Sequence, residues 1–214
     1  HVAYGPTVDV NTDLHNPAVS TRSCSDNPDL AIAMSKAFCE GARSQGALTT
    51  LKHYPGQGHT HSDSHRDLPV SDVSRDEMER IHLRPFQELA ADGLADAVMT
   101  AHLWYPAYHP ETPWPATLSR TFNEDILRRQ FGFEGVLISD AFNMAGIVSA
   151  IPHEPERAAR AIEEGIDVVL VTDDTKAVHA GILEAVRSGR IGEERLDQSV
   201  RRVLEAKSKA GLPS

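Results

Sequence analysis

Short apolar, β-rich runs alternate with helical patterns along almost the whole chain, and this alternation restricts the fold more than any other feature of the sequence. Regular alternation of strands and helices predicts an α/β fold with a parallel sheet. The runs are nearly continuous in apolar residues, which is typical of strands buried on both faces. Five such runs are present: VAYGPTVDV (2–10), ALTTLK (47–52), ADAVMTAH (95–102), GVLISD (135–140) and IDVVLVTD (166–173).

Helical patterns fill the intervals between these runs, and several carry start or stop signals. Pro28 suits the first turn of a helix, and Ser74 followed by Glu77 forms a capping-box pattern. Pro85 interrupts this second helical pattern and predicts a kink or a split there. The predicted helices cover residues 28–45, 74–91, 121–132, 154–164, 175–188 and 193–210.

The residues at the ends of the strands distinguish between two architectures. An open doubly wound sheet concentrates its ligand-binding groups at one switch point, whereas a TIM (β/α)8 barrel draws them from the carboxyl ends of several strands. Almost every run here ends in a polar, chemically capable side chain: Asp9, Lys52 and His53, His102, Asp140 and Asp173. The pattern favours the TIM-barrel type. Because a complete barrel typically needs about 250 residues, the 214 residues predict an incomplete barrel of about five βα units in a single domain.

Charge and composition exclude several kinds of partner. The formal net charge is −10, whereas binding to a phosphate backbone needs a basic face. No apolar run approaches the roughly 20 residues of a membrane span. Cys24 and Cys39 form neither a disulfide framework nor a paired metal motif. We expect no nucleic acid partner, no membrane span and no cofactor, while the compartment stays open between the cytoplasm, slightly favoured, and an exported location.

The segment KHYPGQGHTHSDSHRDLP (52–69) concentrates ionisable side chains in a stretch without periodicity. Asp63 precedes His65 by two residues, and a neighbouring carboxylate orients an imidazole and raises its basicity. Such a histidine gives and takes back a proton near neutral pH, although the pattern also fits a solvated polar loop. A zinc site is a further interpretation, because four alternating side chains would share one side of an extended segment: His59, His61, Asp63 and His65. Zinc ligands are usually more dispersed, and we assign no metal site.

Other polar residues near the strands are candidates for substrate contacts. A carboxylate at the end of GVLISD, Asp140, suits a nucleophile toward a sugar carbon or a metal ligand, or it caps the next helix. Lys52 and His53 are suited to donate hydrogen bonds to substrate hydroxyls, and a buried lysine is costly unless it is functional or paired. Arg22 is a candidate clamp for the substrate, although an arginine beside a helix is usually a surface residue.

Two segments, in this order and spacing, resemble glycoside hydrolase family 3. The first is the KH-x-PG-x-G…D-S-H pattern of KHYPGQGHTHSDSHRDLP, and the second is the S-D-x-x-x-M pattern of GFEGVLISDAFNM. Together they resemble the β-N-acetylglucosaminidase branch of that family. Further similar segments extend the resemblance over nearly the whole chain: VAYGPTVDVN, TRSCSDNPDL, MTAHLWYP and SVRRVLEAKSKAGL.

The resemblance implies a role for each matching residue. Asp140 would be the nucleophile that forms a glycosyl-enzyme intermediate, and His65, paired with Asp63 on a mobile loop, would be the general acid/base. This pair departs from the two carboxylates of most glycosidases, and the D-S-H pattern is what points to N-acetylglucosamine. The implied reaction is retaining hydrolysis that releases terminal β-linked N-acetylglucosamine from chitin-type or cell-wall oligosaccharides, as in peptidoglycan recycling. The implied sugar-binding residues are Arg22, Lys52, His53 and, near the sugar, His102.

Two departures from the family pattern change what we expect. Gln57 stands where the family usually has histidine, so a loop contact should differ. The family's barrel also has further strands before VAYGPTVDV, one of which carries an acidic residue that holds sugar hydroxyls. We therefore expect an N-terminally truncated catalytic domain over residues 1–214 that is weakly active or inactive alone and self-associates through exposed barrel edges. A phosphorylase that uses phosphate instead of water, and a non-catalytic sugar- or metal-binding remnant, are alternatives.

Overall fold

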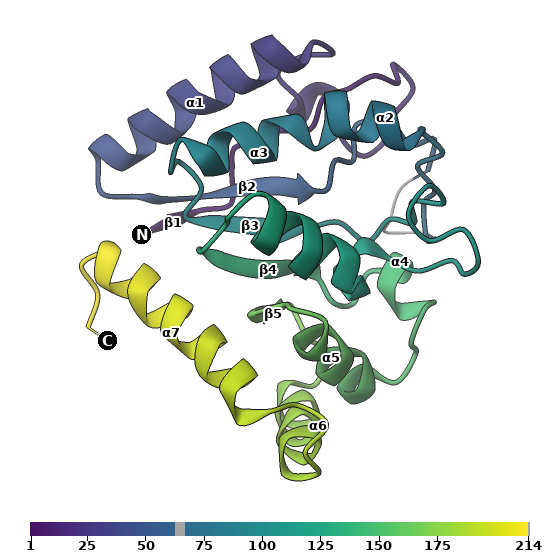
Figure 1. Cartoon of the computed structure of the whole chain (residues 1–214), viewed down its shortest axis with the longest axis vertical. Coiled ribbons are helices and arrows are strands. Elements are labelled where there is room, and N and C mark those ends of the chain that lie inside the picture. Colours follow the sequence, from purple (N-terminus) through teal and green to yellow (C-terminus); the bar gives the residue numbers. More distant parts are fainter. Residues whose placement is uncertain (63–66, 214) are drawn as a thin grey trace.

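One parallel sheet organises the molecule, and its strands are neighbours in space in the same order as in the chain (Figure 1). The computed structural model describes residues 1–62 and 67–213. The sheet is curved, like part of the wall of a barrel (Figure 1), which confirms the prediction of a TIM-barrel type of fold with about five βα units. The strands are β1 (Val2–Ala3), β2 (Leu48–Tyr54), β3 (Ala97–Thr100), β4 (Val136–Ala141) and β5 (Val168–Leu170).

Helices follow the strands and pack beside the sheet (Figure 1). α1 packs against β2 and α3, and α5 packs against β5 and α6. The α-helices are α1 (Pro28–Ser44), α2 (Arg75–Glu77), α3 (Arg84–Ala91), α4 (Ala145–Val148), α5 (Glu154–Glu163), α6 (Thr175–Arg187) and α7 (Glu193–Lys209). Short 3-10 turns are η1 (Ser20–Arg22) and η3 (Ala116–Leu118), and the π-helical segments are η2 (Met78–His82) and η4 (Thr121–Gln130). Within the described ranges, no helix has the length and apolar character needed to cross a membrane.

The first strand is shorter than the sequence suggests. The prediction of a continuous strand over 2–10 is wrong, because β1 covers only Val2–Ala3. Pro6 has no N–H group to continue the ladder of hydrogen bonds. The chain nevertheless keeps its course beside β2, since the Val8 amide donates to the Lys52 carbonyl at 2.8 Å.

The predicted helix over 74–91 starts at the predicted N-cap, Ser74, and is split near Pro85, as the sequence indicates. The Ser74 hydroxyl accepts a hydrogen bond from the Glu77 amide at 3.2 Å, which caps α2. Pro85 occupies the first turn of α3, so the chain passes from α2 through η2 into a separate helix. Both the capping-box prediction and the predicted split are confirmed.

Side chains alternate between the two faces of the sheet, as the two-residue period of a strand requires. The inward rows are Leu48, Thr50 and Lys52 on β2, and Val136, Ile138 and Asp140 on β4. Each row is mainly apolar toward the amino end of its strand and ends in an ionisable group at the carboxyl end. Alternation on a parallel sheet thereby brings Lys52 and Asp140 to the same end of the inner face.

The outer face of the sheet forms the main hydrophobic core. Leu51, Val98 and Leu137 are each at most 1% exposed. They belong to one cluster that includes Phe86 of α3 and Phe122 of η4. Burying a large apolar side chain contributes about 1.5–3 kcal/mol, so this face holds the helices to the sheet.

Two buried aspartates, each at the amino end of a strand, bind the neighbouring strand and a helix. Asp96, just before β3, accepts hydrogen bonds from the Thr49 amide of β2 at 3.1 Å and from Arg43 of α1 at 2.8 Å. Asp167, just before β5, likewise accepts from an amide of β4 at 2.9 Å and from Arg128 of η4 at 2.7 Å. Each carboxylate therefore fixes the register of a strand pair and holds the helix that precedes that pair in the chain.

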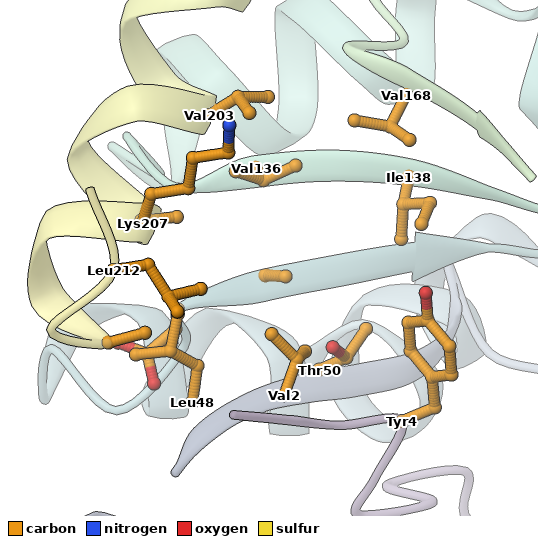
Figure 2. Close-up of a pocket in the computed structure, with 14 residues that line it drawn as sticks. Val2, Tyr4, Leu48, Thr50, Val136, Ile138, Val168, Val203, Lys207 and Leu212 are labelled. Carbon is orange, nitrogen blue, oxygen red and sulfur yellow. The ribbon is translucent and has the colours of Figure 1, made fainter. Parts of the chain in front are cut away.

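The inner face is apolar and open toward the amino ends of the strands (Figure 2). A cavity of about 180 Å³ there is bounded by strand side chains and by the last turns of α7. Val2 and Tyr4 on this face are about half exposed. A second exposed apolar row follows one side of α1 at four-residue spacing and consists of Leu30, Met34 and Phe38.

We expect the isolated chain to self-associate, because β1 and β5 each have a neighbour on one side only within the described sheet and apolar side chains flank the β1 edge. Phe38 lies over Gly5 beside that edge, so Phe38→Lys should raise the dissociation constant of self-association about tenfold. Sedimentation velocity over a concentration series measures this constant.

The control is Ser44→Lys, which adds the same charge at the exposed end of α1 and should leave self-association unchanged. A chain that stays monomeric at every concentration would contradict the prediction.

Candidate active site

A cavity of about 450 Å³ lies at the carboxyl ends of the strands, within the size range of small-molecule sites. It collects side chains from β2, β3, β4 and β5 and from the loops that follow β1 and β2. Four predicted site residues line it: Arg22, Lys52, His53 and Asp140. The sheet thus brings together residues that are far apart in the sequence, as a barrel-type site requires.

A fully buried carboxylate, Asp9, holds one wall of this cavity in place. It accepts hydrogen bonds from His53 Nδ1 at 2.8 Å, from the His53 amide at 3.1 Å and from the Gln57 amide at 2.6 Å. Burial by itself would raise the pKa of Asp9, but His53 and the amide donors lower it below its ordinary value. Asp9 is therefore ionised at neutral pH and fixes the His53 ring with Nδ1 toward the carboxylate, which leaves Nε2 for another partner.

The turn after β2 is anchored on the segment that follows Asp9. Asn16 Nδ2 donates to the Gln57 carbonyl at 2.7 Å. A Cβ atom on Gly58 would lie 1.7 Å from the Val10 carbonyl oxygen, so no other residue fits at this close approach of two backbones. Gln57, which replaces the histidine of the family pattern, serves this anchor through its backbone N–H and C=O groups.

Two cations and one carboxylate set the charge of the cavity. Burial lowers the pKa of the half-buried Lys52, and Arg22 lowers it further, while Asp140 and Asp9 act in the opposite direction. Arg22 is exposed at the end of η1, where its Nε donates to the Ala18 carbonyl at 3.0 Å. The guanidinium thus lies at the rim of the cavity, which agrees both with a clamp for substrate and with a surface residue.

Asp140 ends the inward row of β4 and is partly exposed toward the cavity. Its Oδ1 accepts a hydrogen bond from the Ala141 amide at 2.7 Å. The N-cap of α4 is Met144, and no side chain of a described residue caps that helix. The interpretation of Asp140 as a helix cap is therefore wrong, and its carboxylate faces a cavity instead.

His102 does not line the cavity and instead supports the segment that carries Asp140. The ring is 1% exposed, with Nε2 at 3.1 Å from the Ala141 carbonyl oxygen and Nδ1 at 2.7 Å from Thr117 Oγ1. Burial lowers the pKa of His102 to about 4, although Asp140 and the backbone hydrogen bond to Ala141 act against this shift. The predicted neighbour of the sugar thus lies behind Asp140, outside the cavity wall.

The histidine-rich segment is described only in part. Its predicted acid/base pair lies outside the described residues: Asp63 and His65. The two preceding histidines contact separate partners, since His59 Nδ1 is 3.0 Å from Thr12 Oγ1 and His61 Nδ1 is 2.8 Å from Asp13 Oδ2. Within residues 1–62 and 67–213, no three His, Cys, Asp or Glu side chains are arranged to hold a metal ion.

Two residues that line the cavity, and one buried beside the turn after β2, gave no signal in the sequence. Tyr4 and Met144 line the cavity, and Tyr4 also lines the apolar cavity at the other end of the sheet. His82 of η2 is fully buried, and neither ring nitrogen has a hydrogen-bond partner among the described residues. A Cβ on Gly56 would lie 2.8 Å from the His82 Cβ, so the His82 backbone and Cβ lie directly against the turn after β2. A histidine in a helical pattern does not reveal such burial.

Comparison with known protein families identifies the chain. Residues 1–206 match the family described as "Glycosyl hydrolase family 3 N terminal domain". This chain belongs to glycosyl hydrolase family 3. The resemblance stated from the sequence motifs is therefore confirmed, and the match covers nearly the whole chain.

This chain is similar to parts of several longer proteins that are named as glycosidases or as a phosphorylase. It is 32% identical to "Beta-hexosaminidase A" of Pseudoalteromonas piscicida, over 98% of this chain and 38% of that protein. It is 38% identical, with a TM-score of 0.93, to a glycoside hydrolase family 3 beta-N-acetylglucosaminidase from Paenibacillus sp. str. FPU-7, over 99% of this chain and 40% of that one. "Beta-glucoside phosphorylase BglX" is 32% identical, also with a TM-score of 0.93, over 99% of this chain and 39% of that protein. The chain thus spans about two fifths of the length of these relatives.

Replacing Asp9 with asparagine should lower the free energy of unfolding at pH 7 by about 3 kcal/mol, because a buried charge-assisted hydrogen bond is lost and its partners are left unsatisfied. The pKa of Asp9 is lowered on folding, so its contribution is present above the unfolded value and is lost as the pH falls through the folded value. The difference between wild type and Asp9→Asn should therefore shrink in acid.

Denaturant titrations of Asp9→Asn test this expectation. Asp125→Asn is the control, because Asp125 is an exposed partner of Arg129 and such pairs contribute about 0–1 kcal/mol. Equal losses of stability in the two variants would contradict the assigned role of Asp9.

Stability should also fall on mild acidification because two histidines are buried. Burial lowers the pKa of both His82 and His102 to about 4 from 6.5. Between these values the unfolded chain binds more protons than the folded one, so each histidine should contribute about 1.4 kcal/mol of lost stability per pH unit. His82→Leu removes no hydrogen bond among the described residues and should reduce the slope of unfolding free energy against pH between pH 5 and 6.5.

Urea titrations at several pH values measure that slope, with the exposed His179→Leu as the control. A slope in His82→Leu equal to that of wild type would show that His82 does not take up a proton on unfolding in this range.

Proposed function

We propose that this family 3 domain carries the catalytic residues of a retaining exo-β-N-acetylglucosaminidase, which releases terminal β-linked N-acetylglucosamine from chitin-type or cell-wall oligosaccharides. The observation that carries the proposal is the single cavity into which Lys52, His53 and Asp140 all face. The hexosaminidase and acetylglucosaminidase named above support the same class of substrate.

In the first half of the proposed reaction, the carboxylate of Asp140 attacks the anomeric carbon. The bond from that carbon to the leaving oxygen breaks, and His65 donates a proton to the oxygen. A glycosyl ester on Asp140 results. Support for this role comes from the partial exposure of Asp140 toward the cavity and from the absence of any helix-capping contact for it among the described residues.

In the second half, a water molecule attacks the same carbon. His65 takes one proton from the water as the new C–O bond forms, and the ester bond to Asp140 breaks. Two inversions at the anomeric carbon give net retention. A histidine serves both steps because it is a weak acid and a weak base near neutral pH.

Described residues before and after the acid/base segment lie beside this cavity, which supports the role proposed for His65. On the amino side, Gln57 lines the cavity and is bonded to Asp9. On the carboxyl side, the Asp67 carbonyl oxygen lies about 3.1 Å from where a Cβ on Gly146 would be, shortly after Met144 of the cavity wall. Both ends of the segment therefore lie beside the proposed site.

Sugar hydroxyls would be held by donors on the β2 side of the cavity. Lys52 has three N–H donors, and its lowered pKa reflects burial beside Arg22. His53 is fixed through Nδ1 by Asp9, so its Nε2 is the group free to meet a hydroxyl. Arg22 at the rim would close over the sugar from the side of η1.

A phosphorylase is a second candidate, for a specific reason. The cavity combines two cations, Arg22 and Lys52, with one carboxylate, Asp140, and the phosphorylase BglX superposes on this chain as well as the acetylglucosaminidase does. An anionic phosphate would then replace water in the second step. Formation of a sugar 1-phosphate in phosphate buffer would select this alternative.

Hydrolysis of p-nitrophenyl β-N-acetylglucosaminide by the purified chain tests the proposal. We expect slow turnover, because the chain spans about two fifths of the length of its relatives. Asp140→Asn should lower kcat by about 1,000-fold or more, since it removes the attacking carboxylate.

Asp173→Asn is the matched control, because Asp173 also follows a strand but is exposed and outside the cavity. Turnover that persists in Asp140→Asn would overturn the assigned nucleophile. A wild-type chain with neither turnover nor calorimetric binding of N-acetylglucosamine would overturn the proposed function.

A further inference from the structure

A buried network of polar side chains lies directly behind Asp140. His102 and Thr117 are at most 1% exposed, and they join the end of β3 to the end of β4. His102 Nε2 is 3.1 Å from the Ala141 carbonyl oxygen, and His102 Nδ1 is 2.7 Å from Thr117 Oγ1. Thr117 Oγ1 is also 3.0 Å from Thr100 Oγ1 and 3.0 Å from the Ala101 carbonyl oxygen.

The chemistry of the partners fixes where the protons lie. The Ala141 carbonyl oxygen only accepts hydrogen bonds, so His102 Nε2 must carry a hydrogen to bond with it. The ring is buried, and burial lowers its pKa to about 4, so it is neutral at pH 7 and its second nitrogen has no hydrogen. Nδ1 must then accept a hydrogen bond, and the Thr117 hydroxyl is placed to donate it at 2.7 Å.

We propose that Thr117 is a positioning residue for the nucleophile: its hydroxyl donates to His102 Nδ1, which keeps the His102 proton on Nε2, where it holds the carbonyl of the residue after Asp140. This inference rests on the proposed role of Asp140. Thr100 completes the network by donating its own hydroxyl hydrogen to Thr117 Oγ1.

The opposite tautomer is unfavourable in this surrounding. With the proton on Nδ1, the lone pair of Nε2 would face the lone pairs of the Ala141 carbonyl at 3.1 Å, and this carbonyl would keep only the hydrogen bond from the Met144 amide at 3.2 Å. The Thr117 hydroxyl has one hydrogen: directed at His102 Nδ1, the shorter contact at 2.7 Å, it favours the proton on Nε2, whereas directed at the Ala101 carbonyl at 3.0 Å it leaves Oγ1 to accept from a protonated Nδ1. The position of this one hydroxyl hydrogen therefore decides the tautomer of the imidazole.

The tautomer matters because the chain after Asp140 is fixed from both sides. The Ala141 amide donates to Asp140 Oδ1 at 2.7 Å, and the carbonyl of Ala141 accepts from His102. The next carbonyl, of Phe142, accepts from the buried Arg157 at 3.0 Å. With these peptides held, the Asp140 carboxylate keeps one orientation toward the cavity, and such preorganisation of a reacting group lowers the barrier.

The first test reads the tautomer itself and needs no catalytic activity. Nitrogen-15 spectra of the full chain at pH 7 should show His102 as a neutral ring with a directly bonded hydrogen on Nε2 and none on Nδ1. In Thr117→Val, which removes the hydroxyl at nearly constant volume, the Nε2-protonated form should lose population. A His102 ring in wild type that is protonated on Nδ1, or on both nitrogens, would overturn the proposal.

The second test separates positioning from stability. Thr117→Val should lower kcat on the p-nitrophenyl substrate about 10- to 100-fold, with KM changed less than about threefold, because a misplaced reacting group mainly affects the chemical step. Thr117→Ser keeps the hydroxyl and should restore kcat to within about threefold of wild type. Thr49→Val is the control: it removes another fully buried hydroxyl, which donates to Leu94 at the amino ends of the strands.

Equal losses of kcat in Thr117→Val and Thr49→Val, or no rescue by serine, would show that Thr117 acts through stability and would overturn the proposal. If Thr117→Val does not fold, the nitrogen-15 spectrum of wild type still tests the tautomer of His102, and Thr117→Ser still tests whether the hydroxyl is what kcat requires. A wild-type chain without turnover would count against the proposed function, whereas the spectrum of His102 would still decide the inference about the tautomer.

Discussion

The carboxylate of Asp9 is the interaction on which the rest of the candidate site depends. It has no solvent contact, and three N–H groups converge on it, two from His53 and one from Gln57. These bonds join the segment after β1 to the end of β2 and to the turn that follows β2. Lys52 and His53 can face the cavity because the buried Asp9 carboxylate holds the backbone at His53 and Gln57 on the side away from the cavity.

The two ends of the sheet have different tasks. At the amino ends, Asp96 and Asp167 each join two strands and a helix through buried hydrogen bonds, and the side chains between them are apolar. At the carboxyl ends, the same inward rows finish in Lys52 and Asp140. Because alternation has a period of two residues, the register that the aspartates fix at one end also decides which side chains reach the cavity at the other.

The sequence predicted the features that depend on local pattern. The apolar runs located β2 and β4, and the residues at their ends, Lys52 and Asp140, proved to share a cavity. The strand predicted over 2–10 was too long because Pro6 lacks an amide hydrogen. The position of His102 behind Asp140 could not be predicted, since it depends on Thr117 of η3, which returns to the end of β3, and on Ala141, which becomes a neighbour only when β3 and β4 pair.

Tyr4 lines both the apolar cavity of the inner face and the polar cavity with Asp140. A group that binds on the inner face and moves the Tyr4 ring would also change the shape of the polar cavity that contains Asp140. Thermodynamic linkage is reciprocal, so a sugar that prefers one position of the ring must strengthen or weaken the covering of the inner face by the same free energy. Covering of the inner face and occupancy of the polar cavity are then one coupled equilibrium, whose sign depends on the position of the Tyr4 ring that each one favours.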